Sequence, residues 1–291
     1  METMNIVCFG FGQVAKNFIK KINSENLKIN LTVTSREKSN KGSFDGLNYK
    51  SFQFSENSFD KKLIENLKSS NHILVSIAPV NGEDIVIKNF KNIFDNNKIK
   101  WITYLSATSV YGNHNGDWVN ENSKTNPTST NGIDRLNAEK TWLNLAEKKK
   151  LPIQILRLSG IYSNQNNILS RLKSGNAKII EKKNQFFSRI HVEDIANILF
   201  KSLQNFQAKE IYNVSDDKPA SIKEVILYGS KLLNTEKPET VELSSIESKM
   251  VKNFYKDSKK VDNKKMKEFF NYKLKYPTYV EGLNYIHNNT I

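Results

Sequence analysis

The stretch Asn5-Ile-Val-Cys-Phe-Gly-Phe-Gly-Gln-Val-Ala15 decides the fold. Its first five residues form a short apolar run, which is typical of a buried strand. The apolar residues after the two glycines share one stripe at helical spacing: Val14, Ala15, Phe18, Ile19 and Ile22. A strand, a glycine turn and a helix, in that order, open a dinucleotide-binding fold.

Each small residue of the turn has a physical role in such a fold. Gly10 permits the tight turn, Gly12 lets the backbone approach a diphosphate, and Ala15 lets the helix pack closely on the strand. The unpaired N–H groups at the start of the helix would face the phosphates. Glycine turns also occur without a ligand, so the motif alone is weak. We expect the cofactor contacts to come from the whole turn: Gly10, Phe11, Gly12, Gln13 and Val14.

The end of the second predicted strand discriminates between cofactors. Residues Ile29–Thr34 alternate as a strand does and lead into Ser35 and Arg36. A site for NAD usually carries Asp or Glu here, which accepts a hydrogen bond from the ribose 2′-hydroxyl, whereas an arginine pairs with a 2′-phosphate. We therefore expect NADP rather than NAD, with Ser35 and Arg36 at the adenosine ribose. A surface arginine in a turn is the competing interpretation.

Strands and helices alternate over the next hundred residues. The predicted elements are strands at 49–54, 72–79, 100–106 and 154–158, and helices at 59–67 and 133–149. This alternation predicts an α/β protein with a doubly wound parallel Rossmann sheet, which binds ligands at the carboxyl ends of its strands. Ile77, Ala78 and Pro79 lie at such an end, and we expect them to contact the cofactor.

The chain is long enough for two lobes. Residues 1–160 form the predicted dinucleotide-binding domain, and residues 186–214 return to it. From about Ser215 the pattern changes to helices rich in Lys, Tyr and Phe. Residues 161–185 and 215–291 are therefore the predicted smaller C-terminal α/β substrate lobe.

Composition excludes several classes of protein. The 291 residues are 38% hydrophobic and 25% charged, which is ordinary globular usage. The longest uncharged apolar stretch, 73–80, is too short for a membrane span, and no signal peptide is visible. The single cysteine, Cys8, excludes an internal disulfide. We expect a cytoplasmic protein that binds no membrane.

The formal net charge of +14 has two explanations. Lys and Asn are abundant throughout, so most of the charge can lie on solvated helix faces. The alternative is an anionic small-molecule substrate. Aromatic and basic residues do not interleave as they do in base-stacking modules, so we expect no nucleic acid.

Five motifs in order resemble the extended short-chain dehydrogenase/reductases of the NAD-dependent epimerase/dehydratase group. They are Gly10-Phe-Gly-Gln-Val-Ala15, Tyr104-Leu-Ser-Ala-Thr-Ser-Val-Tyr-Gly112, Arg157-Leu-Ser-Gly-Ile-Tyr162, Arg189-Ile-His-Val-Glu-Asp-Ile-Ala196 and Tyr212-Asn-Val-Ser-Asp-Asp217. The spacing of the glycines resembles an atypical branch of this family, because most extended members space them differently. The resemblance covers nearly the whole chain and implies a Rossmann domain, a nicotinamide cofactor and a polar, often nucleotide-linked, substrate.

The resemblance also implies a catalytic triad that this chain lacks. Such enzymes use Ser or Thr, Tyr and Lys, and the tyrosine exchanges a proton while hydride moves at the nicotinamide. The corresponding positions here are Ala107, Asn131 and Arg135. Alanine forms no side-chain hydrogen bond, and an asparagine amide has no proton that it can give up as an acid near neutral pH. The only Tyr-x-x-x-Lys, from Tyr255 to Lys259, falls in the C-terminal lobe, and we interpret it as a coincidence.

Other residues are candidates for the missing roles. Thr108 lies at the end of a strand and His114 in the loop after it, where active-site residues often lie. Histidine is the residue type most often used as a general acid or base, although a solvated loop histidine is the simpler interpretation of His114. Arg135 keeps a fixed cation for a ribose or a phosphate. By resemblance, Tyr111 and Arg189 border the substrate, and Arg189 would bind its phosphate or carboxylate.

Two function hypotheses follow. The first is an NADP-binding oxidoreductase or epimerase-like enzyme with altered acid and base residues, which acts on a small polar or nucleotide-linked carbonyl or alcohol. The second is a catalytically silent NADP-binding protein with a regulatory or partner-binding role. No histidines have metal-ligand spacing, so we expect no metal. By analogy with the family, the predicted helix 133–149 could form a homodimer.

Overall fold

A computed structural model describes residues 3–94 and 97–289. The chain forms two compact units. The first contains the chain up to Ala107, Ile133–Arg157 and Ile195–Tyr212, and the second contains Thr108–Gly132, Leu158–Asp194 and the chain from Asn213 onward. The division predicted from the sequence differs mainly at residues 108–132 and 186–194, which it assigned to the first lobe.

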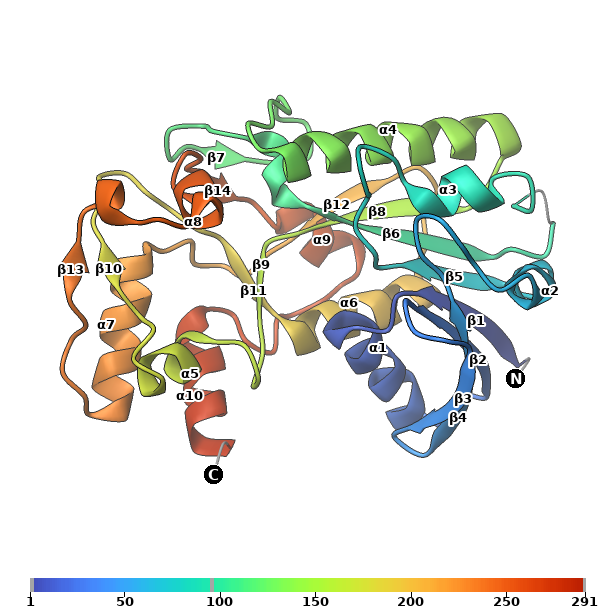
Figure 1. The fold of residues 1–291 in the computed structure, drawn as a ribbon, viewed down its shortest axis with the longest axis horizontal. Coiled ribbons are helices and arrows are strands. Elements are labelled where there is room, and N and C mark those ends of the chain that lie inside the picture. The colour runs from blue at the N-terminus through green and yellow to red at the C-terminus, as the bar shows by residue number, and fades with distance from the viewer. Residues whose placement is uncertain (1–2, 95–96, 290–291) are drawn as a thin grey trace. The chain divides into compact units, whose positions relative to one another are not determined.

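The first unit is built on an eight-stranded sheet (Figure 1) with the order β12-β8-β6-β5-β1-β2-β4-β3. The pairs β1–β2, β1–β5, β2–β4 and β5–β6 are parallel, and β3 is antiparallel to β4. The strands are β1 (Met4–Phe9), β2 (Ile29–Ser35), β3 (Asn40–Phe44), β4 (Leu47–Gln53), β5 (His72–Val75), β6 (Trp101–Ala107), β8 (Ile153–Leu158) and β12 (Ile211–Val214). The mostly parallel Rossmann sheet expected from the sequence is confirmed.

Helices cover both faces of this sheet (Figure 1), as a doubly wound fold requires. One face carries α1 (Gln13–Ser24) and α6 (Val192–Gln204). The other carries α2 (Lys62–Lys68), α3 (Ile85–Phe90) and α4 (Thr130–Lys149). On that side the core is apolar and rich in aromatic residues, among them Phe9, Phe54, Phe90 and Trp142. Between β2 and β4 the chain forms the strand β3 in place of a crossover helix.

The second unit contains three short parallel strand pairs and several helices. The pairs are β7 (Trp118–Val119) with β14 (Lys260–Val261), β9 (Gly160–Tyr162) with β11 (Arg189–His191), and β10 (Ile179–Ile180) with β13 (Thr240–Val241). The helices are η1 (Thr108–Tyr111), α5 (Ile168–Lys173), α7 (Ile222–Leu233), η2 (Leu243–Ser245), α8 (Lys249–Phe254), α9 (Lys264–Phe269) and α10 (Tyr279–Asn289).

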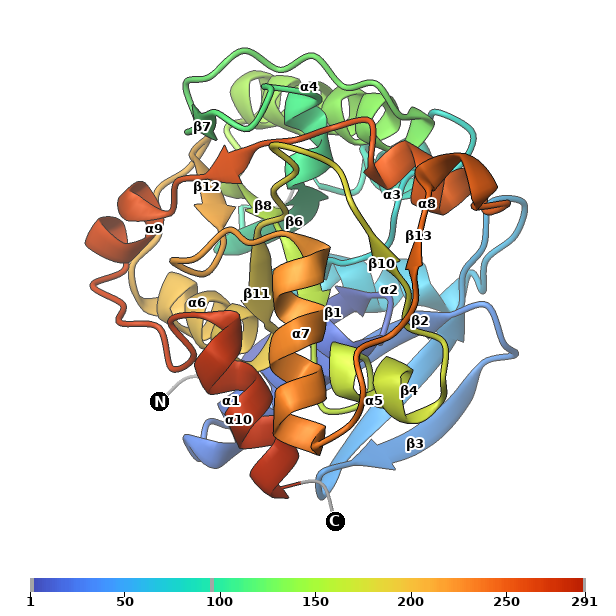
Figure 2. The ribbon, with the colours of Figure 1, turned by 90° about the vertical axis from the view of Figure 1, so that its left-hand side faces the viewer.

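The core of the second unit lies where α5, α7 and α10 meet (Figure 2). Its buried members include Leu169, Val225, Tyr279 and Leu283. Gly229 lets α5 approach α7 closely, because a Cβ at this position would lie 2.8 Å from Leu172 Cδ1. The second unit is therefore α/β, as expected for the smaller lobe.

Candidate functional site

Gly10 joins the carboxyl ends of three strands in the first unit. Its φ of +88° lies in the region that favours glycine, and a Cβ there would lie 2.8 Å from Ile77 Cγ2 and Ser76 Oγ. Its N–H donates to Thr34 Oγ1 at 3.0 Å, and the Ser76 hydroxyl donates to Phe9 O at 2.9 Å. These bonds tie β1 to β2 and β5, so the turn is held in one conformation.

Gly12 leaves the start of α1 open. It is the N-cap residue and supplies no side-chain hydrogen bond, so the first N–H groups of the helix lack an intrahelical partner. A Cβ built on Gly12 meets no atom within 4 Å among the described residues. The first turn of α1, which begins at Gln13 and Val14, carries no acidic residue. The backbone here can therefore accept an anion.

The Phe11 side chain packs on the β3–β4 hairpin. Its ring centroid lies 5.5 Å from that of Phe44 and 5.2 Å from that of Tyr49, in the β3–β4 hairpin. Lys16 Nζ lies 5.8 Å from the ring centroids of both Phe11 and Phe44. The hairpin thus packs against the glycine turn.

Two further segments of the predicted cofactor site follow β2 and β5. Ser35 Oγ accepts a hydrogen bond from Glu37 N at 3.2 Å. Arg36 is exposed and has no polar partner in the described part of the chain. Ile77 and Pro79 are half-buried, whereas Ala78 is exposed. The predicted contacts therefore lie at the ends of β1, β2 and β5, three adjacent strands.

The three residues at the expected triad positions offer no ordinary proton donor. Ala107 is the last residue of β6, and Asn131 is exposed in the first turn of α4. Arg135 follows Asn131 by four residues, so both share one face of α4. The Arg135 guanidinium donates to the backbone oxygen of Leu105.

Farther along α4 the polar groups are buried and paired. Arg157 Nη2 lies 2.7 Å from Glu139 Oε2, and the side chains are 4% and 2% exposed. Asp84 caps α3 and also accepts a hydrogen bond from Trp142 Nε1 at 2.9 Å. Burial raises the pKa of Asp84, although its hydrogen bonds oppose this. These residues hold α4 and α3 in place.

In the second unit, the candidates Thr108, Tyr111 and His114 differ in what they contact. The Thr108 hydroxyl has no hydrogen-bond partner among the described residues, and Thr108 is half-buried. Tyr111 is fully buried, and its hydroxyl donates to Asn213 Oδ1 at 2.7 Å. His114 Nε2 lies 3.1 Å from the backbone oxygen of Lys124, so this nitrogen carries the proton.

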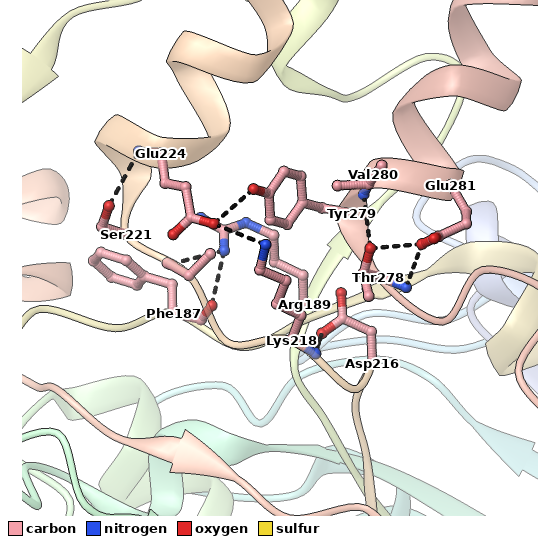
Figure 3. A network of polar contacts seen from close by, with 11 residues as sticks. Phe187, Arg189, Asp216, Lys218, Ser221, Glu224, Thr278, Tyr279, Val280 and Glu281 are labelled. Atoms are coloured by element: carbon pink, nitrogen blue, oxygen red, sulfur yellow. Dashed lines mark hydrogen bonds and ion pairs between the residues drawn. The ribbon is translucent and has the colours of Figure 1, made fainter.

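Arg189 lies in a partly satisfied polar network (Figure 3). Its Nη1 donates to Phe187 O at 2.8 Å and to Ala220 O at 3.0 Å, whereas the buried Nη2 has no partner among the described residues. Asp216 is 1% exposed, and its Oδ2 is also unpartnered within the described residues. Burial raises the pKa of Asp216 well above its usual value, although Arg189 opposes this. The five quoted motifs contain Asp216, but spacing gave no reason to select it.

His191 is a packing residue of the second unit. It is fully buried, with its ring centroid 4.1 Å from that of Tyr276 and 5.1 Å from that of Tyr162. Burial lowers the pKa of His191 to about 4. The ring is therefore neutral at pH 7, as expected for a histidine inside an aromatic cluster.

The described part of the chain holds neither a cluster of metal-binding side chains nor a membrane-spanning helix. No group of three or more His, Cys, Asp or Glu side chains within residues 3–94 and 97–289 has the arrangement of a metal site. Over the same residues, no helix has both the length and the apolar character needed to cross a membrane.

Residues 60–215 match the model of the NAD dependent epimerase/dehydratase family, which is more than half of the chain. The chain belongs to this family. A functionally unknown conserved protein from Silicibacter pomeroyi is 30% identical, with a TM-score of 0.87 and coverage of 99% of both chains. No curated protein sequence matches the chain.

Two more distant family structures share the fold. One is dTDP-glucose 4,6-dehydratase from Bacillus anthracis in complex with NAD, 18% identical, with a TM-score of 0.77 over 98% of this chain and 96% of that one. The other is UDP-glucuronic acid 4-epimerase from Bacillus cereus in complex with NAD, 15% identical, with a TM-score of 0.78 over 99% of both. The family resemblance inferred from the five motifs is therefore confirmed.

Proposed function

We propose that the first unit binds NADP(H) and that the protein is an oxidoreductase of the extended short-chain type. The observation that carries the proposal is the glycine turn. Gly10 adopts a conformation that other residues disfavour, and the open space at Gly12 would be filled by any Cβ. A dinucleotide diphosphate fits there, because it would pair with the free N–H groups at the start of α1.

The preference for the phosphorylated cofactor rests on Arg36. This exposed cation follows β2, where the adenosine ribose lies in a Rossmann site, and it has no competing partner among the described residues. Its guanidinium would bind the 2′-phosphate, with the Ser35 hydroxyl beside it. Ile77, Ala78 and Pro79 would line the same cofactor from the end of β5.

Replacing this cation tests the preference. In Arg36→Ala, we expect NADPH to bind about 10-fold to 100-fold more weakly, the cost of one or two charge-assisted hydrogen bonds. NADH binding should change by less than about threefold, because NADH lacks the 2′-phosphate. The control is Lys38→Ala, which removes an exposed cation two residues away. Equal losses for NADPH and NADH in calorimetry would refute the assignment.

The substrate would be a small polar or nucleotide-linked carbonyl or alcohol, which is anionic if Arg189 binds it. Bound NADP(H) supplies the hydride, and the chain must supply a proton donor and acceptor. His114 is our first candidate and the unpartnered hydroxyl of Thr108 the second, whereas Tyr111 is buried and already bonded to Asn213. We expect His114→Ala to abolish turnover that Asn131→Ala leaves intact. Unchanged activity in His114→Ala would exclude this role.

The alternative is an NADP-binding protein without catalysis. It is favoured by Arg135, whose guanidinium is already bonded to Leu105 O, and by the absence of a hydroxyl at Ala107 and Asn131. If it is correct, the wild-type protein reduces no carbonyl with NADPH, and the triple variant Ala107→Ser, Asn131→Tyr, Arg135→Lys gains activity. Turnover by the wild-type protein would exclude it.

A further inference from the structure

Arg189 and Asp216 bring opposite charges to one place inside the second unit. Arg189 begins β11, and Asp216 lies in the turn that leads to α7. The Asp216 N–H donates to Arg189 O at 2.7 Å, and the Ser215 hydroxyl donates to the same oxygen at 3.3 Å. The two side chains therefore start from neighbouring points of the backbone, although the residues are far apart in the sequence.

Each of these side chains keeps one buried atom unused. Arg189 Nη2 and Asp216 Oδ2 are both enclosed, and neither has a hydrogen-bond partner within the described part of the chain. Among the residues drawn in Figure 3, no ion pair or hydrogen bond joins the two side chains. Buried polar atoms without a partner are rare in folded proteins. Here two of them, on groups of opposite charge, occur in one network.

The remaining polar atoms of the two side chains hold the backbone around them. Arg189 Nη1 donates to Phe187 O and Ala220 O, and these two residues also pair with each other through an isolated antiparallel bridge. Asp216 Oδ1 accepts a hydrogen bond from Lys218 N at 3.3 Å, which closes the turn before α7. This bond is longer than most N–H···O bonds, so little is lost when it breaks.

Charged and titratable groups from several elements surround the pair. They act on Asp216, on Arg189 or on Tyr162 beside them, and they are Tyr162 of β9, Asp194 of α6, Glu224 of α7, Tyr279 and Glu281 of α10, Tyr255 after α8, and Asp217 and Lys218 in the turn. Asp216 is 1% exposed, and this burial raises the pKa of its carboxyl group well above the usual value, although Arg189 opposes it.

The two protonation states of Asp216 favour different arrangements. A neutral carboxyl group can remain apart from Arg189, as it does in this structure. An ionised carboxylate that is buried and unpaired is strongly unfavourable. Pairing Oδ2 with Arg189 Nη2 would remove this cost and would give both unused atoms a partner. Oδ1 would then move away from Lys218 N, because both oxygens belong to one planar group.

We propose that Asp216 is a proton-controlled switch for the turn 216–221. When the carboxyl group holds its proton, Oδ1 keeps the turn closed through Lys218 N. When the proton passes to the solvent, the carboxylate pairs with Arg189 Nη2 and the turn opens. Lys218 also pairs with Glu224, which accepts a hydrogen bond from Tyr279, so the change would reach the contact between α7 and α10.

The switch lies within the second unit and rests neither on cofactor binding nor on catalysis. NMR on the full-length protein therefore tests it directly. The carboxyl carbon of Asp216 reports ionisation, and we expect its midpoint above the value of about 3.9 for aspartate in peptides, because burial raises its pKa. The Lys218 amide reports the turn. Its protection against solvent exchange, corrected for the intrinsic pH dependence of exchange, should fall above the same midpoint.

Two results with the wild-type protein would overturn the proposal. The first is a carboxyl midpoint at or below about 3.9. The second is a Lys218 amide that stays equally protected on both sides of the midpoint. This second result would indicate a water molecule that bridges Arg189 and Asp216 without a change in the turn.

Asp216→Asn and Asp217→Asn form a matched pair of variants. Asp216→Asn keeps an oxygen for Lys218 N but cannot ionise, so the Lys218 amide should stay protected across the titration. Asp217→Asn keeps the switch and removes a negative charge that raises the pKa of Asp216, so the midpoint should decrease. The amide spectrum shows whether each variant is folded. If Lys218 in folded Asp216→Asn still loses protection at the wild-type midpoint, another group causes the change and the proposal is wrong.

Discussion

The glycine turn and the β6–α4 region of the first unit differ in what their polar groups contact. At the turn, the backbone of Gly12 and the start of α1 have space before them and no capping side chain. In the β6–α4 region, Arg135 is bonded to Leu105 O, and Glu139 is bonded to Arg157.

This difference indicates which region is suited to bind a ligand and which region stabilises the fold. Polar groups that are left open suit a ligand, whereas polar groups that are buried and paired stabilise the fold. In this chain the first description fits the proposed cofactor site, and the second fits the region where the family resemblance leads us to expect catalysis. Substitutions in the two regions should therefore affect different quantities.

The largest effect is expected in the β6–α4 region. Glu139→Ala removes the carboxylate that pairs with the buried guanidinium of Arg157 and should lower the free energy of unfolding by about 3–5 kcal/mol. Glu147→Ala is the control, since Glu147 pairs with Lys150 and Lys209 at the surface and should cost less than about 1 kcal/mol. Urea unfolding measures both. Similar small losses would mean that the Glu139–Arg157 pair does not hold α4.

Substitutions of the two glycines in the turn should affect different quantities: Gly10→Ala should lower stability, and Gly12→Ala should weaken NADPH binding. Gly10→Ala places a Cβ 2.8 Å from Ile77 and Ser76 at positive φ, and we expect about 2–4 kcal/mol of lost stability. Gly12→Ala should change stability by less than about 1 kcal/mol. It should nevertheless weaken NADPH binding at least about tenfold, because the new methyl group occupies the ligand's space. Thermal unfolding and calorimetry distinguish the two, and undiminished binding in Gly12→Ala would contradict the proposed contact.

A third region to compare is the aromatic cluster around His191, in the second unit. The pKa of His191 is about 4 in the folded protein and about 6.5 when unfolded, so the unfolded chain binds the proton first as the pH falls. Stability should therefore decrease from pH 6.5 towards pH 4, and this histidine should account for roughly 2 kcal/mol at pH 5.

The check is the pH dependence of urea unfolding. His191→Phe should lose this part of the dependence, whereas His287→Phe, in the exposed part of α10, should keep it. If His191→Phe and wild type lose the same stability between pH 7 and pH 5, the buried ring is not the cause.

The parts of the fold that could be predicted from the sequence are those marked by a local pattern of residues. The β1 strand, the glycine turn and α1 were predicted correctly, because their apolar periodicity and turn residues lie within 20 residues of one another. The strand β3 was missed, because Asn40-Lys-Gly-Ser-Phe44 has neither an apolar run nor a clear alternation. It forms because it pairs with β4.

The candidate sites could be predicted only in part, for the same reason. Gly10 and Gly12 could be predicted from their residue type and their position after an apolar strand. In contrast, Tyr111 is bonded to Asn213, 102 positions away. Arg189 and Asp216, which each keep one buried side-chain atom without a partner among the described residues, are 27 positions apart (216 − 189). Arrangements of this kind depend on tertiary structure, and no spacing rule indicates them.

Calorimetry of the wild-type protein with NADPH and NADH tests the central claim most directly. Our account predicts that NADPH binds with a dissociation constant in the micromolar range, and NADH at least about tenfold more weakly. Absence of binding by either nucleotide at millimolar concentration would contradict it, because the open backbone at Gly12 would then serve no dinucleotide.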